Sequence, residues 1–326
     1  MKLTDAAEIN RVLYPSVTLA DYVDDWNGVG EGQVKFYREK GYLALRNGYS
    51  KELIDASGDA IKAMLNDRYM RTREEFNTWM RERRMESTAA ETAPAGLEPA
   101  EESGESKRVK LPFVQIVKPD GATRIVDDIR PCESVGSFDE YERMARKIGD
   151  YVYYDERFYA MAYHPELLRV VEMLLGEKPK LVQDMALLKP PQGGGEKPWH
   201  QDMAYRGLDY DRSILGVWIA VDEASVDNGC MHIIPRSHML GGVPHYAERD
   251  WQMCDENVEA DRALVAPLDP GGLLFFHGML HHGTPSNFST KKRRALQFHY
   301  AAESSEMVTP KEYKRMFTNE MSGAQC

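Results

Sequence analysis

The second half of the chain is a series of short apolar runs separated by turn residues, and this pattern most limits the fold. The runs are KLVQDMALLK, SILGVWIAVDE, CMHIIP, GGLLFFHG and RRALQFHYA. The breaks between them contain PPQGGG, DNG, PGG and PSN. Several short strands separated by such turns are typical of a β-sandwich or a closed β-barrel. We therefore predict an antiparallel β core over residues 181–302.

The first part of the chain, residues 1–180, has a helical pattern instead. Ser50 is a candidate N-cap, and apolar residues recur after it at helical spacing as far as Leu65. Pro165 opens another helix, and Gly176 follows its end. A short strand is expected over residues 42–45. Helices therefore precede the β core.

One segment of this first part differs in composition from the rest. Residues 86–106 are rich in Ala, Glu, Pro, Ser and Gly, and Leu97 is their one large aliphatic side chain. Such a stretch cannot offset its ordering entropy by burial. We predict a disordered insertion here, either inert or acting as a lid.

Composition excludes several classes of protein. The 326 residues carry 41 Lys+Arg against 52 Asp+Glu, a formal net charge of −11, which disfavours a nucleic-acid partner. No window approaches 18 consecutive apolar residues, and the first residues contain no apolar signal core, so we expect neither a membrane span nor secretion. The cysteines lack CxxC spacing, which excludes a disulfide scaffold or a thiolate zinc cluster and suits a reducing, cytoplasmic location. They are Cys132, Cys230, Cys254 and Cys326.

The sequence WHQD contains a candidate pair of metal ligands. On an extended chain, residues i and i+2 point to the same face, so His200 and Asp202 can reach one ion while Gln201 points away. A helix would not allow this, since residues i and i+2 do not face each other there. A third ligand must come from elsewhere, and the segment GLLFFHGMLHHGT supplies His277, His281 and His282.

Two imidazoles and one carboxylate form the facial triad of non-haem Fe(II) oxygenases. Three protein ligands leave three open positions on an octahedral ion. A bidentate 2-oxo acid fills two of these positions, and dioxygen fills the third. An HxD triplet alone also occurs by chance, as a surface histidine near a surface aspartate, so its context must decide.

The context consists of several motifs that occur together. They are LLKPP (187–191), WHQD (199–202), the strand ending in Trp218, DNGCMHIIPRSH (227–238), PGGLLFFHGMLHHGT (270–284) and NFSTKKRRALQFHY (287–300), with a looser match back to FYREKGYLAL. Together they resemble the phytanoyl-CoA dioxygenase family of Fe(II)- and 2-oxoglutarate-dependent oxygenases. The resemblance implies a mainly β fold with flanking helices, whose core is a double-stranded β-helix (a cupin-like jelly roll). Residues 1–326 would form a single catalytic domain.

The resemblance also selects the metal ligands. His200 and Asp202 match the family's HxD pair. The family's second histidine stands directly before Gly and Ser or Thr, which selects His282, with His281 as the alternative. Neighbours on a strand point to opposite faces, so these two should not both bind the ion. His277 matches a position that is not a ligand.

The family binds the far carboxylate of 2-oxoglutarate with an arginine soon after the last histidine. Arg293 fits, and the adjacent Arg294 is the alternative; strand alternation places Arg293 on the more polar face, with Gln297 and His299. The planar guanidinium suits the role because it meets a carboxylate with two parallel hydrogen bonds. Further positions that match family contacts to 2-oxoglutarate are Thr284, Trp218, Met185 and, less closely, Lys147. Small neighbours of Trp218, Gly216 and Ala220, would leave space for a ligand.

The resemblance implies a dioxygenase that uses Fe(II), 2-oxoglutarate and O₂, oxidises a C–H bond of a small molecule, and releases succinate and CO₂. The presence of Asp202 favours hydroxylation over halogenation. The alternatives are a cupin-type metalloenzyme that does not use 2-oxoglutarate and a non-catalytic binding protein on the same fold. An anionic substrate is among the candidates. Side chains that could recognise it, or could equally be solvated loop residues, are Tyr205, Arg206, Tyr210, Arg212, Arg236, His245 and Tyr246.

Overall fold

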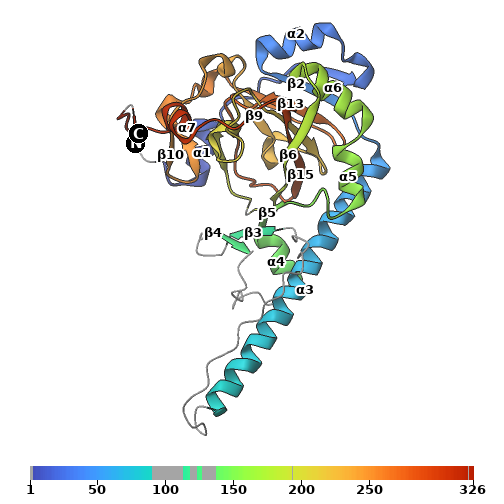
Figure 1. Ribbon diagram of the computed structural model, residues 1–326, viewed down its shortest axis with the longest axis vertical. Helices are drawn as coiled ribbons and strands as arrows, with labels where there is room; N and C mark the ends of the chain where they lie inside the picture. The colour runs from blue at the N-terminus through green and yellow to red at the C-terminus, as the bar shows by residue number, and fades with distance from the viewer. Residues whose placement is uncertain (1–2, 90–112, 118–122, 127–136, 193, 322) are drawn as a thin grey trace.

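The computed structural model describes residues 3–89, 113–117, 123–126, 137–192, 194–321 and 323–326. Its α-helices are α1 (Ala6–Leu13), α2 (Glu31–Lys40), α3 (Lys51–Ala89), α4 (Phe138–Met144), α5 (Glu156–Ala162), α6 (Pro165–Leu175) and α7 (Pro310–Phe317). Short 3₁₀ helices lie at Trp26–Gly28, Asp202–Ala204, Val226–Asn228, Ser237–Leu240, Asp255–Asn257 and Ala260–Arg262. Figure 1 shows a body of strands and helices from which α3 projects.

The strands form two main sheets and one hairpin. They are β1 (Tyr22–Asp25), β2 (Tyr42–Asn47), β3 (Phe113–Val117), β4 (Thr123–Val126), β5 (Ala145–Gly149), β6 (Pro179–Lys189), β7 (Lys197–His200), β8 (Leu215–Ala220), β9 (Met231–Ile233), β10 (His245–Ala247), β11 (Trp251–Met253), β12 (Leu264–Ala266), β13 (Leu273–His277), β14 (His282–Thr284) and β15 (Arg293–Ala302). The large sheet has the order β1-β2-β13-β8-β15-β6-β5-β3-β4, the small sheet the order β12-β9-β14-β7, and β10 pairs with β11.

This arrangement confirms the mainly β fold class with flanking helices. The pairing is antiparallel throughout the named strands except between β1 and β2, and the two main sheets do not close into a barrel. The first part of the chain is less purely helical than expected, since β1 to β5 also join the large sheet. Only β2 was predicted among these five, because the others are short and their apolar residues do not alternate regularly. They are strands because the edges of a large sheet offer them partners.

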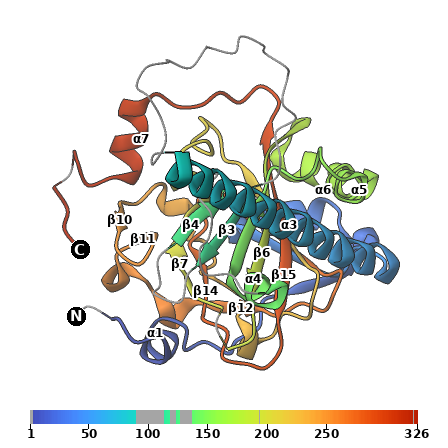
Figure 2. The same cartoon turned by 90° about the horizontal axis from the view of Figure 1, so that it is seen from below.

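Helices α3, α5 and α6 cover one face of the large sheet (Figures 1 and 2). Helix α6 has the predicted limits: Pro165 is its first residue, and Gly176 ends it in the left-handed conformation, with φ 76°. Alternation along β15 sends Leu296, Phe298 and Tyr300 into this helix-covered core. The other face of β15 is turned toward the small sheet and carries the polar residues discussed below.

Helix α3 is longer than the sequence pattern indicated. It begins near Ser50 as predicted but continues to Ala89, so residues 86–89 of the predicted insertion are helical. The remainder of that insertion, residues 90–106, lies outside the described residues. Gly58, which interrupts the apolar pattern, accepts a hydrogen bond on its backbone oxygen from Arg294 Nη1 at 2.9 Å. A Cβ at this position would lie 3.1 Å from the Arg294 guanidinium, so the glycine makes room for that arginine.

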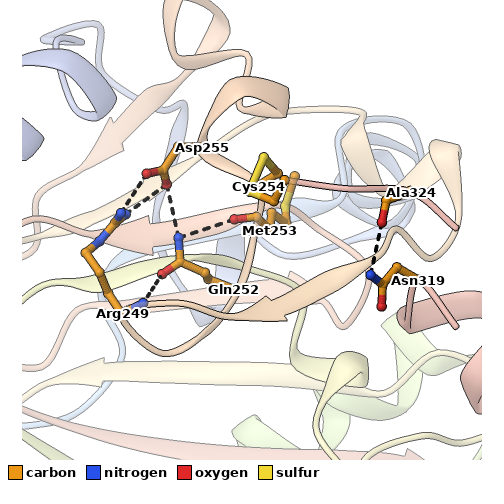
Figure 3. The surroundings of a disulfide bond; sticks show 8 residues. Arg249, Gln252, Met253, Cys254, Asp255, Asn319 and Ala324 are labelled. Carbon is orange, nitrogen blue, oxygen red and sulfur yellow. Dashed lines mark hydrogen bonds and ion pairs between the residues drawn. A yellow bond between two sulfur atoms is a disulfide. The ribbon is translucent and has the colours of Figure 1, made fainter. Parts of the chain in front are cut away.

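The C-terminal region packs on the segment that follows Asp202. The Tyr313 hydroxyl of α7 donates a hydrogen bond to the Ala204 carbonyl at 2.7 Å, and Phe317 is fully buried. A disulfide joins Cys254, just after β11, to Cys326 (Figure 3), and cysteine spacing did not predict this pair, which is separated by 72 residues. In the same region, the Asn319 amide donates to the Ala324 carbonyl at 3.0 Å.

Within the described ranges, no helix combines the length and apolar character that a membrane crossing requires.

Candidate metal centre

Three side chains from two neighbouring strands and the turn beyond one of them meet between the sheets. His200 ends β7, His282 begins β14, and the two residues lie opposite each other in the antiparallel register of the small sheet. Asp202 starts the 3₁₀ helix just after β7. Asp202 Oδ1 lies 3.3 Å from His200 Nε2 and 3.5 Å from His282 Nε2. Among the described residues, these three form the group that could hold a metal ion, and all three are buried.

Backbone carbonyls fix both imidazoles in the orientation that a metal requires. His200 Nδ1 donates a hydrogen bond to the Pro198 carbonyl at 2.7 Å, and His282 Nδ1 donates to the Leu280 carbonyl at 2.9 Å. With the proton of the neutral ring on Nδ1, Nε2 is the nitrogen that can bind a metal, and in both residues it points at the partner ligands. The geometry therefore offers two nitrogen donors.

The charge state of the cluster also suits a cation. Burial, together with the neighbouring His282, lowers the pKa of His200 to about 4, so its imidazole is neutral near pH 7. Burial alone would raise the pKa of Asp202, but the surrounding imidazoles, His299 first among them, hold it well below its ordinary value. Asp202 is therefore ionised.

Gln201 points away from the cluster, as predicted, and its side chain ties neighbouring loops together. Its amide nitrogen donates to the Gly241 and Met279 carbonyls, each at 2.8 Å, and its amide oxygen accepts from the Val243 backbone N–H at 2.9 Å. The Gln201 backbone N–H donates to His245 Nε2 at 3.0 Å. The residue between the two candidate ligands thus holds the turn leading to His282.

Two residues that the sequence placed only on the polar face of β15 contact Asp202 directly. His299 Nε2 donates a hydrogen bond to Asp202 Oδ2 at 2.7 Å. Gln297 Nε2 lies 3.1 Å from the same oxygen and donates to it. Strand alternation could have found the face, but the sequence held no signal for which carboxylate these residues would meet.

Arg293 and Arg294 have opposite surroundings. Arg294 forms an ion pair with Asp222, with Nη2 2.8 Å from Oδ1. Arg293 is 1 % exposed, and its Nε and Nη1 have no hydrogen-bond partner among the described residues. Its guanidinium carbon lies 5.4 Å from the centre of the Trp218 ring, and burial lowers its pKa to about 10. An unpartnered guanidinium buried inside the protein is suited to an anion.

The other residues matched to 2-oxoglutarate contacts lie around Arg293. Gln297 of β15 is opposite Met185 on β6 and Trp218 on β8, so these three side chains share the inner face of the large sheet. Lys147 on β5 is opposite Leu187, two residues farther along β6, and therefore belongs to the same face. Burial, followed by the charge of Lys197, lowers the pKa of Lys147 to about 8.

Thr284 lies two residues beyond His282 on β14 and is 6 % exposed. The structure thus brings all the predicted site residues to the space between the two sheets, and their roles as ligands stay predictions.

One expectation about this space was wrong. The missing side chain of Gly216 does not leave room for a ligand, because the Phe276 ring fills it. A Cβ on Gly216 would lie 2.4 Å from Phe276 Cζ. The Phe276 ring in turn lies 4.7 Å from the His282 ring, centre to centre. Gly216 therefore supports the packing behind a candidate ligand.

Lys189 is a buried cation that the sequence analysis did not single out, although it stands in the LLKPP motif. It lies opposite Arg293 in the β6–β15 register. Its Nζ donates to the backbone carbonyls of Gly195 at 2.5 Å and Pro285 at 2.6 Å. Burial and the charge of Arg293 hold its pKa well below the ordinary lysine value. Lys189 ties the loop before β7 to the segment after β14.

The two remaining histidine candidates are not in the cluster. His277 Nδ1 accepts a hydrogen bond from the Met279 backbone N–H at 3.1 Å and lies 3.0 Å from Ser213 Oγ. His281 is buried, and its backbone N–H donates to Ser237 Oγ at 2.8 Å. Its ring is not part of the group at Asp202. Geometry therefore favours His282 over His281.

Three arginines proposed as recognition residues are paired with acids of the chain itself. Arg206 pairs with Asp209, Arg212 with Glu177, and Arg236 with Glu39. Tyr205 receives a hydrogen bond from Lys197 Nζ at 2.6 Å, and His245 accepts from the Gln201 backbone. Among the arginines considered, Arg293 alone lies at the candidate centre with unpartnered donors.

Known proteins resemble this chain in sequence. Residues 37–295 match the model of the phytanoyl-CoA dioxygenase (PhyH) family. Phytanoyl-CoA dioxygenase domain-containing protein 1 of Rattus norvegicus is 30% identical over 200 residues, which cover 56% of this chain and 69% of that protein. The peroxisomal phytanoyl-CoA dioxygenase of Homo sapiens is 27% identical over 205 residues, 60% of each chain.

Solved structures resemble it in fold. EctD from S. alaskensis superposes with a TM-score of 0.56 at 17% identity, covering 91% of this chain and 84% of that one. The carbocyclase SnoK has a TM-score of 0.56 at 16% identity, covering 91% and 94%. At such identities the likeness concerns the fold, and it agrees with the jelly roll that the resemblance to the family implies. Because the family model spans residues 37–295, which include every candidate ligand, the chain belongs to the phytanoyl-CoA dioxygenase family.

Proposed function

We propose that this protein is an Fe(II)- and 2-oxoglutarate-dependent dioxygenase that oxidises a C–H bond of a small-molecule substrate. The observation that carries the proposal is the juxtaposition of two sites between the sheets. One is the buried group of His200, Asp202 and His282. The other is the buried Arg293 with unpartnered donors.

The residues present fit both the metal and the cosubstrate. Two imidazoles and one carboxylate are the donor set of non-haem Fe(II) oxygenases. Besides the unpartnered Arg293 atoms, the buried Trp218 Nε1 has no hydrogen-bond partner in the described part of the chain. Buried donors of this kind are costly unless an acceptor meets them. A dicarboxylate such as 2-oxoglutarate supplies the acceptors.

The roles of the residues follow from this placement. His200, Asp202 and His282 would hold the ion, and Arg293, with Thr284, would hold the far carboxylate of 2-oxoglutarate. Bound iron and 2-oxoglutarate supply the oxidising chemistry, which consumes O₂ and releases succinate and CO₂. Trp218 and Met185, which are both buried, would line the cosubstrate and shield it from water. The protein thus contributes position and shielding, as is general for cofactor enzymes.

Structural relatives agree with this proposal. EvdO2 was solved in complex with 2-oxoglutarate, at a TM-score of 0.52 and 19% identity to this chain. EctD was solved with 2-oxoglutarate and 5-hydroxyectoine. Likenesses at these identities concern the fold, so the proposal stops at a small molecule, and an anionic substrate stays a prediction.

Succinate release provides the test. The purified protein, loaded with Fe(II) and 2-oxoglutarate under anaerobic conditions, should show the absorption band of the iron–2-oxoglutarate chelate. On admission of O₂, members of a metabolite library that are substrates should increase succinate formation above the uncoupled background. His200→Ala should abolish both signals. A cupin-type enzyme would bind metal without the chelate band, and a binding protein would retain its biological effect in His200→Ala. Either result would overturn the proposal.

A further inference from the structure

The two carboxylate oxygens of Asp202 have different surroundings. Oδ1 faces the two candidate histidine ligands, at 3.3 Å from His200 Nε2 and 3.5 Å from His282 Nε2. Oδ2 instead accepts a hydrogen bond from His299 Nε2 at 2.7 Å, and Gln297 Nε2 lies 3.1 Å from the same oxygen and 2.9 Å from His299 Nε2. We propose that His299 and Gln297 are positioning residues that hold Asp202 so that it presents a single oxygen to the metal. This inference rests on the metal centre of the proposed function.

The placement of the two positioning residues is rigid. Both lie on β15, where each of them is paired with a residue of β6 and a residue of β8 in the interior of the large sheet. Residues two apart on a strand share a face, so both side chains point toward Asp202. His299 is fully buried and Gln297 is 3 % exposed. Their donors are therefore fixed by the sheet, whereas Asp202 itself stands at the start of a short 3₁₀ helix.

Counting coordination positions shows why one oxygen matters. With His200, His282 and one oxygen of Asp202, an octahedral ion keeps three positions open. Bound 2-oxoglutarate would take two of these positions, and O₂ would need the third. If both oxygens of Asp202 bound the ion, only two positions would remain, and 2-oxoglutarate would leave none for O₂. Hydrogen bonds that occupy Oδ2 prevent this second mode of binding.

Partners of this kind also strengthen metal binding. Groups that orient a ligand from behind typically change metal affinity or activity 10–100-fold when they are mutated. His299 is the better placed of the two because its hydrogen bond is shorter, 2.7 Å against 3.1 Å, and its side chain is fully buried. We expect its loss to have the larger effect, with that of Gln297 smaller.

The test measures binding of Mn²⁺, which needs neither O₂ nor turnover. His299→Leu removes the donor at similar volume, His299→Gln retains a donor nitrogen, and Gln297→Met removes the amide. His232→Leu is the matched control, since His232 is equally buried but its ring nitrogens have no hydrogen-bond partner in the described structure. Thermal unfolding of the metal-free proteins reports whether each variant is folded.

The expected dissociation constant for Mn²⁺ rises 10–100-fold in His299→Leu and three- to tenfold in Gln297→Met. His299→Gln should restore affinity to within about threefold of wild type, and His232→Leu should match wild type. An unchanged affinity in folded His299→Leu would show that the residue only fills the core and would overturn the inference. If His299→Leu does not fold, wild-type affinity in Gln297→Met would overturn it instead.

A second readout separates this inference from the proposed function. Affinity of the Mn²⁺-loaded protein for 2-oxoglutarate should fall in His299→Leu, because a second oxygen of Asp202 would compete for the open positions. If wild-type protein bound Mn²⁺ but not 2-oxoglutarate, the dioxygenase proposal would fail. The Mn²⁺ affinities of the variants would still decide the role of His299.

Discussion

Arg293 and Arg294 are chemically identical neighbours whose environments differ completely. Strand alternation turns Arg293 toward the space between the sheets and Arg294 toward α3 and Asp222. The sequence could predict this division, because the face of Arg293 also carries Gln297 and His299 while the opposite face is apolar. It could not show that Arg293 has no acidic partner among the described residues, since that depends on residues distant in the chain.

This difference makes the pair a matched test of 2-oxoglutarate binding. Arg293→Ala should weaken binding by on the order of 10²–10³, because it removes one member of a buried ion pair. Arg294→Ala should leave 2-oxoglutarate affinity within a few-fold of wild type and should instead lower the free energy of unfolding. Calorimetric titration of the metal-loaded protein measures the affinities. If Arg294→Ala weakened 2-oxoglutarate binding more than Arg293→Ala, Arg294 would be the residue that binds the far carboxylate of 2-oxoglutarate.

His277 gives a prediction about pH. Burial and the nearby His238 lower the pKa of His277 to about 3, against about 6.5 in the unfolded chain. The unfolded state therefore binds a proton between these two values that the folded state does not, so stability is lost as pH falls from 6.5 toward 3. Because of His277, the free energy of unfolding should fall by about 1–2 kcal/mol when the pH is lowered from 7 to 5.

Urea unfolding at both pH values checks this expectation. His277→Gln keeps an acceptor for the Met279 N–H but does not titrate, so its stability should fall less than that of wild type over the same interval. An equal loss of stability in the two proteins would contradict a neutral, buried His277.

The pairing of β8 with β13 places the Phe276 ring against His282. Gly216 of β8 is opposite Phe276 of β13, whose ring lies between Gly216 and His282. The sequence predicted both strands, but it assigned the space beside Trp218 to a ligand. Which side chain fills the space over a glycine depends on the register between strands, and that register is not readable from either strand alone.

Gly216→Ala tests this packing. The added methyl group should displace the Phe276 ring and lower the free energy of unfolding by about 1–3 kcal/mol, the usual cost of overpacking. Weaker Mn²⁺ binding should accompany the loss, since the Phe276 ring contacts His282. Gly195→Ala is the control, because a Cβ there meets nothing within 4 Å. Equal denaturation midpoints for the two variants would show that the Phe276 ring moves without cost.

Helices and strands were predicted correctly where the local sequence pattern was strong. Helix α6 and strand β15 were predicted because Pro165, Gly176 and the apolar alternation after Arg293 are local signals. Strand β5 was missed, since ARKIG has no clear alternation and becomes a strand by pairing with β6. The placement of His200 and Asp202 on one face was predicted because they are two positions apart on an extended chain. The contact of His299 with Asp202 joins positions 97 residues apart, so no local pattern could predict it.

For the whole molecule, the disulfide links the end of the described chain to the hairpin of β10 and β11. Around Cys254, Arg249 forms a two-point ion pair with Asp255, at 2.6 and 2.8 Å, and Gln252 donates to the same carboxylate at 3.1 Å (Figure 3). This link was not predicted, because the spacing of cysteines does not reveal which of them meet in space.

Cys326→Ser should therefore lower the free energy of unfolding in the oxidised protein. A bond that closes a segment of 72 residues is worth about 4 kcal/mol in the chain-entropy model, and measured effects are typically about 2–4 kcal/mol. Denaturant titration without reductant should show this difference, and adding reductant should remove it. Equal stabilities under oxidising conditions would mean that the bond does not constrain the unfolded chain.

Arg293 also has a consequence for the abundance of the protein in a cell. Its buried charge lacks a partner in the described chain, so an anion that binds only the folded form stabilises that form by mass action. At 100 times its dissociation constant, such a ligand adds about 2.7 kcal/mol. Chains that lack the ligand would unfold more often and be degraded sooner. The supply of 2-oxoglutarate would then set how much of this protein persists, as well as how fast it works.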